Sequence, residues 1–277
     1  MSAVTLPDGE RVPALGMGTW QLGEDPALRQ DELAAVRLGV ELGLTLVDTA
    51  EMYGEGRTER FLGEALAGLR DRVFLVSKVY PHHASRLGVQ QACERSLQRL
   101  GTDHLDLYLL HWRGREPLAE TVAGFEALRA AGKIRHWGVS NFDTADLEEL
   151  FALPDGQRCA TNQVLYNLAR RGPEFELLPW MGAHGVPLMA YSPIEQGRIA
   201  PGGAVDRIAA RRGATRWQVA LAWVLRRPGT IAIPKTGKVE HLRENHAAQS
   251  LELSAAELAQ LDAQFAAPRR RQSLEML

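Results

Sequence analysis

Four side chains capable of acid–base chemistry follow short apolar runs in this sequence. Asp48, Lys78 and His111 each end such a run, and Tyr53 follows Asp48 closely. The pKa of tyrosine is ordinarily ~10, and a nearby ammonium group would lower it and make the phenol a better proton donor. Lys78 can supply that charge, with Asp48 positioning and partly balancing it. A neutral His111 can donate a hydrogen bond to an oxygen on which negative charge develops. These residue types therefore predict general acid catalysis at a substrate oxygen.

Each of these residues also has a purely structural interpretation. Asp48 could cap a loop, Lys78 could extend its ammonium from a strand end into water, and His111 could be a hydrogen-bonded rim residue. Asp48 and Lys78 could also form only a buried structural ion pair. Lysine is rare here, because 28 of the 32 basic residues are arginine and only four are lysine. The presence of lysine at position 78 is consistent with a need for a compact ammonium group, which arginine does not provide.

These residues belong to a repeated alternation of apolar runs and amphipathic segments. Runs typical of buried strands cover residues 14–19, 44–48, 73–78, 105–111, 134–139, 160–164, 186–191 and 230–234. Segments with helical periodicity cover 31–42, 58–69, 87–100, 118–130, 144–151, 173–184 and 215–226. About eight strands alternating with helices predict an α/β fold, the parallel (β/α)8 or TIM barrel. The competing doubly wound sheet is disfavoured because Gly16-Met17-Gly18-Thr19 lacks the third glycine of its usual fingerprint.

Two segments lie outside this repeat. Residues 4–12 predict an N-terminal β-hairpin, with a turn at Pro7-Asp8-Gly9, that can plug the bottom of the barrel. Ser254, with Glu257 three residues later, predicts a capped extra C-terminal helix over 253–265. The arginine-rich segment 268–271 is predicted to be a solvated, frayed end. Residues 1–277 are thus expected to form a single barrel domain.

Polar side chains end most of the predicted strands. In barrel enzymes the catalytic residues lie at the carboxyl ends of the strands, so these side chains are expected to converge on one mouth. In addition to Asp48, Lys78 and His111, the residues concerned are Ser140, Asn141, Asn162, Gln163, Tyr191, Ser192 and Lys235. Such convergence favours a functional site over a set of unrelated packing residues.

The motifs around these positions resemble the aldo-keto reductase family in sequence and in order. They cover residues 48–54, 76–78, 110–112, 138–142, 162–163, 190–193 and 233–235, and the resemblance extends from the hairpin to about residue 247. It implies a barrel that uses NADPH, without a metal, to reduce aldehydes and ketones to alcohols. The short loops and the Leu-Leu-His-Trp-Arg-Gly segment at 109–114 are most similar to bacterial members that reduce methylglyoxal and small aldehydes.

The resemblance also implies roles for individual residues. Asp48, Tyr53, Lys78 and His111 correspond to the catalytic tetrad of the family, and all four are present. Trp20, Tyr53, His111 and Trp112 are implied to line the substrate pocket. The implied cofactor-binding residues are Thr19, Trp20, Asp48, Ser140, Asn141, Gln163, Tyr191, Ser192, Pro193, Ile194, Gln196, Gly197, Lys235, Thr236, His241, Glu244 and Asn245.

Different parts of this set suit different parts of the cofactor. The amides of Asn141 and Gln163 can hold the nicotinamide carboxamide, and the ring of Tyr191 can stack on the nicotinamide. The turn at 192–197 can wrap the pyrophosphate with its backbone N–H groups. Lys235 and the start of the helix near 239–248 can bind a phosphate.

His241 departs from the family pattern, which has an arginine six residues after the lysine at position 235. That arginine meets the 2′-phosphate of the cofactor, and a neutral imidazole is a weaker partner for a dianion. We therefore expect NADPH to be preferred over NADH, but by a smaller margin than an arginine would give.

Composition and charge exclude several other classes of protein. A content of 45% apolar and 24% charged side chains is typical of a globular protein, and a net charge of -2 predicts no nucleic-acid or membrane partner. No apolar run approaches the ~18 residues that span a bilayer, and the first residues predict no signal peptide. Cys93 and Cys159 show no metal spacing and are expected to be buried free thiols. These features predict a cytoplasmic protein, expected to be a monomer without a metal site.

Two other functions remain open alongside carbonyl reduction. Some members of this family are nicotinamide-binding regulatory subunits of membrane channels with incidental turnover, and a catalytically inactive barrel is a further alternative. The complete tetrad disfavours the inactive barrel, and the lack of an extended partner-binding segment disfavours the regulatory subunit. Little chain follows Phe265. We therefore expect no lid, and an open pocket for small carbonyl substrates.

Overall fold

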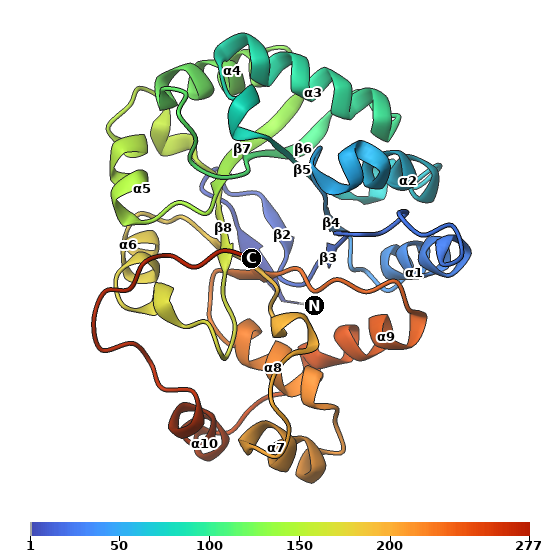
Figure 1. The fold of residues 1–277 in the computed structure, drawn as a ribbon, viewed down its shortest axis with the longest axis vertical. Coiled ribbons are helices and arrows are strands. Elements are labelled where there is room, and N and C mark those ends of the chain that lie inside the picture. The colour runs from blue at the N-terminus through green and yellow to red at the C-terminus, as the bar shows by residue number, and fades with distance from the viewer. Residues whose placement is uncertain (1) are drawn as a thin grey trace.

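Eight parallel strands form the centre of the computed structural model, which describes residues 2–277 (Figure 1). They are β3 (Met17–Gly18), β4 (Leu46–Asp48), β5 (Phe74–Val79), β6 (Leu105–Leu110), β7 (Ile134–Ser140), β8 (Asn162–Leu165), β9 (Leu188–Tyr191) and β10 (Thr230–Ala232). Each strand pairs in parallel with the next along the chain. Parallel bridges between Leu15 and Ala232 and between Gly18 and Lys235 join β3 to β10. The predicted (β/α)8 barrel is thereby confirmed.

Helices surround this ring of strands (Figure 1). They are α1 (Arg29–Glu41), α2 (Arg57–Ala65), α3 (Arg86–Leu100), α4 (Leu118–Ala130), α5 (Thr144–Phe151), α6 (Leu177–Ala183), α7 (Ala204–Arg212), α8 (Arg216–Leu225), α9 (Val239–Ala247) and α10 (Ala255–Gln264). The apolar periodicity predicts α1 to α6 and α8, although the segment expected at 173–184 is divided into the short turn η5 (Gly172–Glu174) and α6. The helix expected near 239–248 is α9, the capped helix expected over 253–265 is α10, and α7 was not predicted. No helix among residues 2–277 combines the length and apolarity needed to cross a membrane.

Local chemistry explains where several helices begin and end. The Ser85 hydroxyl accepts the N–H of Gly88 at the start of α3, and Asp143 and Ser254 form reciprocal capping boxes at the starts of α5 and α10. Glycines with positive φ follow α1, α3, α4 and α6, at Gly43, Gly101, Gly132 and Gly185. A left-handed residue lets the chain leave a helix and turn back toward the next strand.

The predicted hairpin closes one end of the barrel. Strands β1 (Ala3–Thr5) and β2 (Arg11–Pro13) pair antiparallel, and Val4 and Val12 are buried in one apolar cluster with the inner faces of the barrel strands. Glu10 links the hairpin to β7. Its Oε2 lies 2.7 Å from Arg135 Nη2 and 2.6 Å from His136 Nε2. The expectation that the hairpin plugs the barrel is confirmed. Cys93 and Cys159, on the helix side of the barrel, are buried and free as expected.

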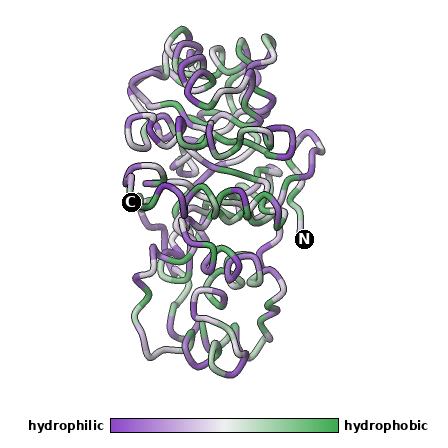
Figure 2. Tube along the Cα trace, turned by 90° about the vertical axis from the view of Figure 1, so that its right-hand side faces the viewer, coloured by the Kyte–Doolittle hydropathy of each residue, from purple (hydrophilic) through white to green (hydrophobic). Residues whose placement is uncertain are grey.

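In the C-terminal tail, residues 266–277, the arginines at 269–271 are exposed as predicted, but the segment 268–271 is not a frayed end. The tail leaves α10, passes the starts of α6 and α5 and ends over the centre of the barrel (Figure 1). Figure 2, a view from the side, shows this end of the chain on the face opposite the N-terminal hairpin. Arg271 pairs with Asp143 and Glu176, and Glu275 pairs with Arg170. The prediction was wrong because these partners lie far away in the sequence.

Candidate active site

Lys78, Asp48 and Tyr53 form one buried hydrogen-bonded group at the carboxyl end of the barrel. Lys78 lies on β5 with its side chain fully buried, Asp48 ends β4, and Tyr53 begins the turn η1 (Tyr53–Gly56). The Nζ of Lys78 donates to Asp48 Oδ2 at 2.8 Å, to the Thr49 carbonyl oxygen at 2.8 Å and to the Tyr53 hydroxyl oxygen at 3.2 Å. All three ammonium protons thus have acceptors. Because the Tyr53 oxygen accepts from Lys78, its own proton is available to another acceptor.

Burial dominates the ionisation of this group. It raises the pKa of Tyr53 above its ordinary value of 10.0, and the Lys78 ammonium offsets only part of that effect. The expectation that Lys78 brings this pKa below the ordinary value is therefore wrong. Loss of water destabilises the phenolate more than the Lys78 ammonium stabilises it. Burial alone would lower the pKa of Lys78, but Asp48 and Tyr53 together raise it above 10.5. At neutral pH the pair is a protonated phenol beside a charged ammonium.

His111 follows β6 and lies beside this group. Its ring centroid is 5.9 Å from that of Tyr53 in an edge-on arrangement and 5.0 Å from that of Trp112. Burial lowers the pKa of His111 well below 6.5, and the Lys78 ammonium lowers it further, so the ring is neutral at pH 7 as expected. Its Nδ1 is buried and has no hydrogen-bond partner within residues 2–277. The other ring nitrogen, Nε2, is therefore the one that remains to contact a ligand.

One cavity of about 880 Å³ collects the residues that the sequence singled out. Every implied substrate and cofactor residue lines it, and Lys78 is buried behind Asp48 and Tyr53. They come from the carboxyl ends of seven strands and from α9, which are separate in the sequence. The cavity is also lined by residues that no sequence pattern indicated, namely Gly18, Gln21, Trp217, Ile233, Pro234, Met276 and Leu277. Met276 and Leu277 carried no signal, because nothing local to the tail shows where it ends.

The tail corrects the expectation that no segment follows to cover the mouth. Its last two residues line the cavity, and the backbone N–H of Leu277 donates to the Tyr191 hydroxyl at 3.4 Å. The mouth is therefore narrowed by the tail, although the side chains of Met276 and Leu277 remain largely exposed.

Amide and hydroxyl groups form a connected network along the cavity wall. The Ser140 hydroxyl donates to the Gln163 carbonyl at 2.8 Å, and Gln163 Nε2 donates to Asp48 Oδ1 at 2.8 Å. The Tyr191 hydroxyl donates to Asn141 Oδ1 at 3.1 Å, and Asn141 Nδ2 donates to the His111 carbonyl at 3.1 Å. This network fixes the side chains that a planar amide ligand would contact, and Gln163 connects them to the buried Asp48 carboxylate.

The loop after β9 has an unusual backbone and lines the cavity. Ser192, Glu195, Gln196 and Gly197 have φ values of 46°, 51°, 52° and 76°, in the left-handed region that L-residues rarely adopt. The N–H groups of Glu195 and Gly197 donate within the loop, to the carbonyls of Ser192 and Ile194 at 2.9 and 3.0 Å, so the loop is a tight, internally hydrogen-bonded turn. The exposed ammonium of Lys235, which makes no hydrogen bond or ion pair within residues 2–277, lines the same cavity. His241, Glu244 and Asn245 also lie there, on α9.

Comparison with known proteins places this fold and site in one family. The Aldo/keto reductase family model matches residues 14–265. The chain therefore belongs to the Aldo/keto reductase family and is an oxidoreductase.

Individual relatives are close to it. The chain is 53% identical over 271 residues to methylglyoxal reductase YeaE of Escherichia coli (strain K12), covering 96% of this chain and 95% of that protein. It is 32% identical over 264 residues to glyoxal reductase of Bacillus subtilis (strain 168), covering 94% and 91% of the two chains. A crystal structure of an aldo/keto reductase from Klebsiella pneumoniae in complex with NADP and acetate superposes with a TM-score of 0.96, at 52% identity and 99% coverage of both chains.

Proposed function

We propose that this protein uses NADPH to reduce small aldehydes and ketones to alcohols, including methylglyoxal and other dicarbonyls, with Tyr53 as the general acid. The observation that carries the proposal is the hydrogen bond from Lys78 to the Tyr53 hydroxyl oxygen, in a cavity that His111 also lines. The similarity to a methylglyoxal reductase and to a glyoxal reductase supports the substrate class. A second structure of the Klebsiella pneumoniae aldo-keto reductase, in complex with NADPH, supports the cofactor.

The residues present fit a nicotinamide dinucleotide. Asn141 and Gln163 offer amides for a carboxamide, and the ring of Tyr191 offers a face for stacking. The loop at 192–197 lines the cavity beside the residues suited to the nicotinamide and is therefore placed to cover the pyrophosphate. The exposed ammonium of Lys235 offers a partner for a further phosphate. When bound, NADPH supplies the hydride that reduces the carbonyl carbon.

The chain's own residues handle the substrate oxygen and its proton. The Tyr53 hydroxyl and His111 Nε2 donate hydrogen bonds to that oxygen and orient the carbonyl. As negative charge develops on the oxygen, Tyr53 transfers its proton to it, and the Lys78 ammonium at 3.2 Å stabilises the phenolate that remains. Asp48, at 2.8 Å from Nζ, holds the ammonium in place. Solvent later returns a proton to Tyr53.

The walls around the reacting atoms favour small substrates. Trp20 and Trp112 line the cavity together with Met52, and the tail contributes Met276 and Leu277. These side chains are bulky and uncharged, so they leave room for short carbonyl compounds and provide no cation to hold a distant anionic group.

Steady-state NADPH oxidation with methylglyoxal, glyoxal and short aldehydes tests this proposal. We expect turnover without added metal and no loss of activity after treatment with a chelator. A protein that binds NADPH but turns over none of these carbonyls would contradict the proposal and would favour a nicotinamide-binding regulatory role. Activity that is abolished by chelation and restored by zinc would contradict the metal-free mechanism.

A further inference from the structure

One arginine joins two segments of the cavity wall that are far apart in the sequence. Arg170, which follows β8, places Nη2 at 3.0 Å from Glu195 Oε1 and Nη1 at 2.6 Å from Glu275 Oε1. Glu195 belongs to the left-handed loop after β9, and Glu275 belongs to the tail. The side chain of Glu195 is 7% exposed and that of Glu275 is 47% exposed, so the first contact is buried and the second faces solvent.

The contact with Glu195 holds the loop in its strained conformation. Asn167 Nδ2 donates to Glu195 Oε2 at 2.8 Å and to the Ser192 carbonyl at 2.9 Å, so it binds the loop beside Arg170. Burial would raise the pKa of Glu195, but the hydrogen bonds from Arg170 and Asn167 lower it below the ordinary value. Glu195 is therefore charged at neutral pH, and its hydrogen bonds with Arg170 and Asn167 stabilise the left-handed φ values of the loop, which are unfavourable on their own.

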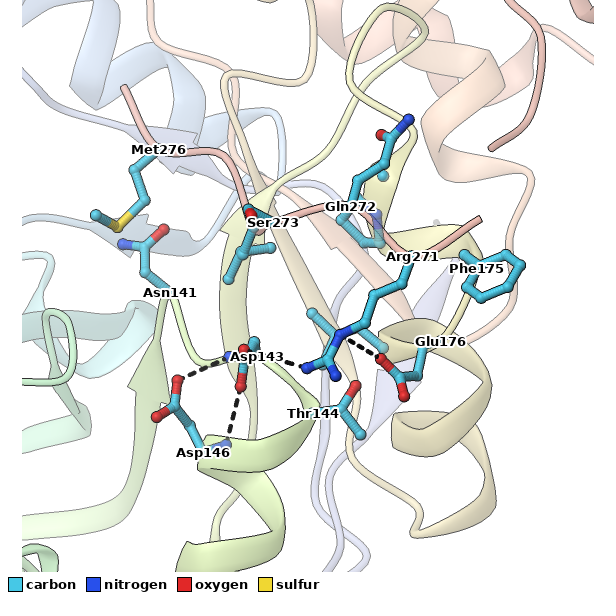
Figure 3. A pocket seen from close by; sticks show the side chains of 14 residues that line it. Asn141, Asp143, Thr144, Asp146, Phe175, Glu176, Arg271, Gln272, Ser273 and Met276 are labelled. Atoms are coloured by element: carbon cyan, nitrogen blue, oxygen red, sulfur yellow. Dashed lines mark hydrogen bonds and ion pairs between the residues drawn. The ribbon is translucent and has the colours of Figure 1, made fainter. Parts of the chain in front are cut away.

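The contact with Glu275 positions the tail at the mouth. Met276 and Leu277, which line the cavity, follow Glu275 directly. The tail is held again at Arg271, whose Nε lies 3.1 Å from Glu176 Oε2 and whose Nη2 lies 3.6 Å from Asp143 Oδ2 (Figure 3). Between these two attachments the tail covers a second cavity of about 510 Å³, lined in part by Asp143 and Glu176. The ion pairs hold the tail on either side of this space, and between them Leu274 packs against the apolar core.

We propose that Arg170 is a positioning residue that couples the phosphate-binding loop after β9 to the C-terminal tail that covers the substrate. A guanidinium suits this role because its planar array of five N–H groups can hold two carboxylates at once. A phosphate bound by the loop stabilises the loop conformation in which Glu195 contacts Arg170. Arg170, held in this position, contacts Glu275 and keeps the tail over the mouth of the cavity. By linkage, any ligand that orders the tail also favours cofactor binding. This inference rests on the proposed function of the same cavity.

Trypsin protection provides a test that does not depend on turnover. Arg269, Arg270 and Arg271 are exposed tryptic sites in the tail, and mass spectrometry can follow the release of the peptide that ends at Leu277. We expect NADPH to slow this cleavage at least several-fold in the wild type. Glu275→Gln should abolish most of the NADPH-dependent protection and, because the coupling is reciprocal, should weaken NADPH binding by about the factor of protection that is lost. Arg158→Gln, which removes an exposed ion pair with Asp155, is the matched control and should behave like the wild type.

Kinetics separate the two contacts of Arg170. Glu275→Gln should raise the KM for methylglyoxal several-fold with little change in kcat, because only the tail contact is lost. Arg170→Gln should raise that KM as well, and it should raise the Kd for NADPH further than Glu275→Gln does, because the contact with Glu195 is also lost. Adding Glu275→Gln to Arg170→Gln should raise the KM no further. Arg170→Lys should recover more of the NADPH affinity than of the methylglyoxal KM, because one ammonium cannot hold both carboxylates.

The outcomes distinguish this inference from the proposed function. NADPH-dependent protection that persists unchanged in Glu275→Gln would overturn the coupling, whatever the turnover of the wild type. Additive effects of Arg170→Gln and Glu275→Gln on the KM would also overturn it. If the wild type turns over no carbonyl, the proposed function fails, while loss of protection in Glu275→Gln would still support the coupling of cofactor loop and tail.

Discussion

Lys78 is the residue on which the chemistry that we propose for the site depends. Its ammonium is fully buried, a position that costs free energy unless every proton has an acceptor. Asp48, the Thr49 carbonyl and the Tyr53 hydroxyl supply those acceptors. Because the Tyr53 oxygen accepts from Lys78, one arrangement satisfies the buried charge and leaves the Tyr53 proton available for the role that we propose.

Tyr53→Phe should remove most of the turnover while leaving cofactor binding intact. The phenol is needed only when the substrate oxygen takes up its proton, and general acid catalysis typically contributes ~10²–10⁴-fold to a rate. We expect a fall in kcat of that order with methylglyoxal and a Kd for NADPH within about twofold of the wild type, measured by fluorescence. A Tyr53→Phe variant with full activity would refute the assignment of the general acid.

His111 should make the protein less stable in mild acid. Its pKa is well below 6.5 in the folded state, so the unfolded chain takes up a proton as the pH falls past 6.5 and the folded chain does not. The stabilising contribution is therefore present above pH 6.5 and is lost as the pH falls. Between pH 8 and pH 5.5 we expect a loss of about 1.4 kcal/mol in the free energy of unfolding from this residue.

Urea unfolding of the wild type and of His111→Phe at both pH values measures this contribution. The wild type should lose more stability than the variant over that interval. Equal losses in the two proteins would show that His111 is as easily protonated in the folded state as in the unfolded chain.

At the scale of elements, the junction between β3 and β10 closes the barrel and also borders the site. Gly18 lies in β3 and lines the cavity, and a Cβ at this position would lie 2.7 Å from the Ile233 carbonyl oxygen. Backbone atoms cannot move aside as a flexible side chain can. The short strand β3 therefore needs glycine in order to approach β10 closely enough for the N–H of Gly18 to donate to the Pro234 carbonyl at 3.1 Å.

Gly18→Ala should separate these two strands and destabilise the protein by ~1–3 kcal/mol, the usual cost of overpacking. Gly182→Ala is the matched control, because Gly182 lies within α6 and a Cβ there would meet nothing within 4 Å. The control should be neutral or stabilised by up to ~1 kcal/mol, since alanine favours helix. Chemical unfolding of both variants measures the difference, and equal stabilities would contradict the tight fit at Gly18.

At the scale of the whole molecule, the site exists only when the barrel is closed. Its walls come from strand ends along residues 18–235, from α9 and from the last two residues of the tail. A ligand that spans this cavity binds the folded chain and not the unfolded one, so binding and folding are linked.

Cofactor binding should therefore raise the melting temperature, and the size of the shift should reveal the role of His241. At 100 times its Kd, NADPH should contribute ~2.7 kcal/mol to the free energy of unfolding. His241→Arg should increase the shift produced by a fixed concentration of NADPH and leave that of NADH nearly unchanged, because only NADPH carries the 2′-phosphate. Thermal unfolding with each cofactor measures both effects. Equal increases for the two cofactors would show that position 241 does not contact that phosphate.

The sequence by itself determined which segments become strands and helices and which polar residues end the strands. These are local properties: buried strands need continuous apolar runs, helix starts need capping side chains such as Ser85 and Ser254, and a hairpin needs a turn such as the one at Pro7-Asp8-Gly9. The barrel followed from the number and alternation of these elements, and the positions of Asp48, Lys78 and His111 followed from the rule that such barrels place chemistry at the carboxyl ends of strands.

Only the tertiary structure decided how charges and distant segments meet. Whether the pKa of Tyr53 is raised or lowered depended on how completely the folded chain excludes water from its hydroxyl group. The identity of the neighbouring charged residues does not reveal the extent of that exclusion. The path of the tail depended on ion pairs such as Arg271 with Glu176, and the position of Arg170 depended on partners 25 and 105 residues away. Such contacts leave no local pattern, because one exposed arginine or glutamate resembles any other until folding brings its partner within reach.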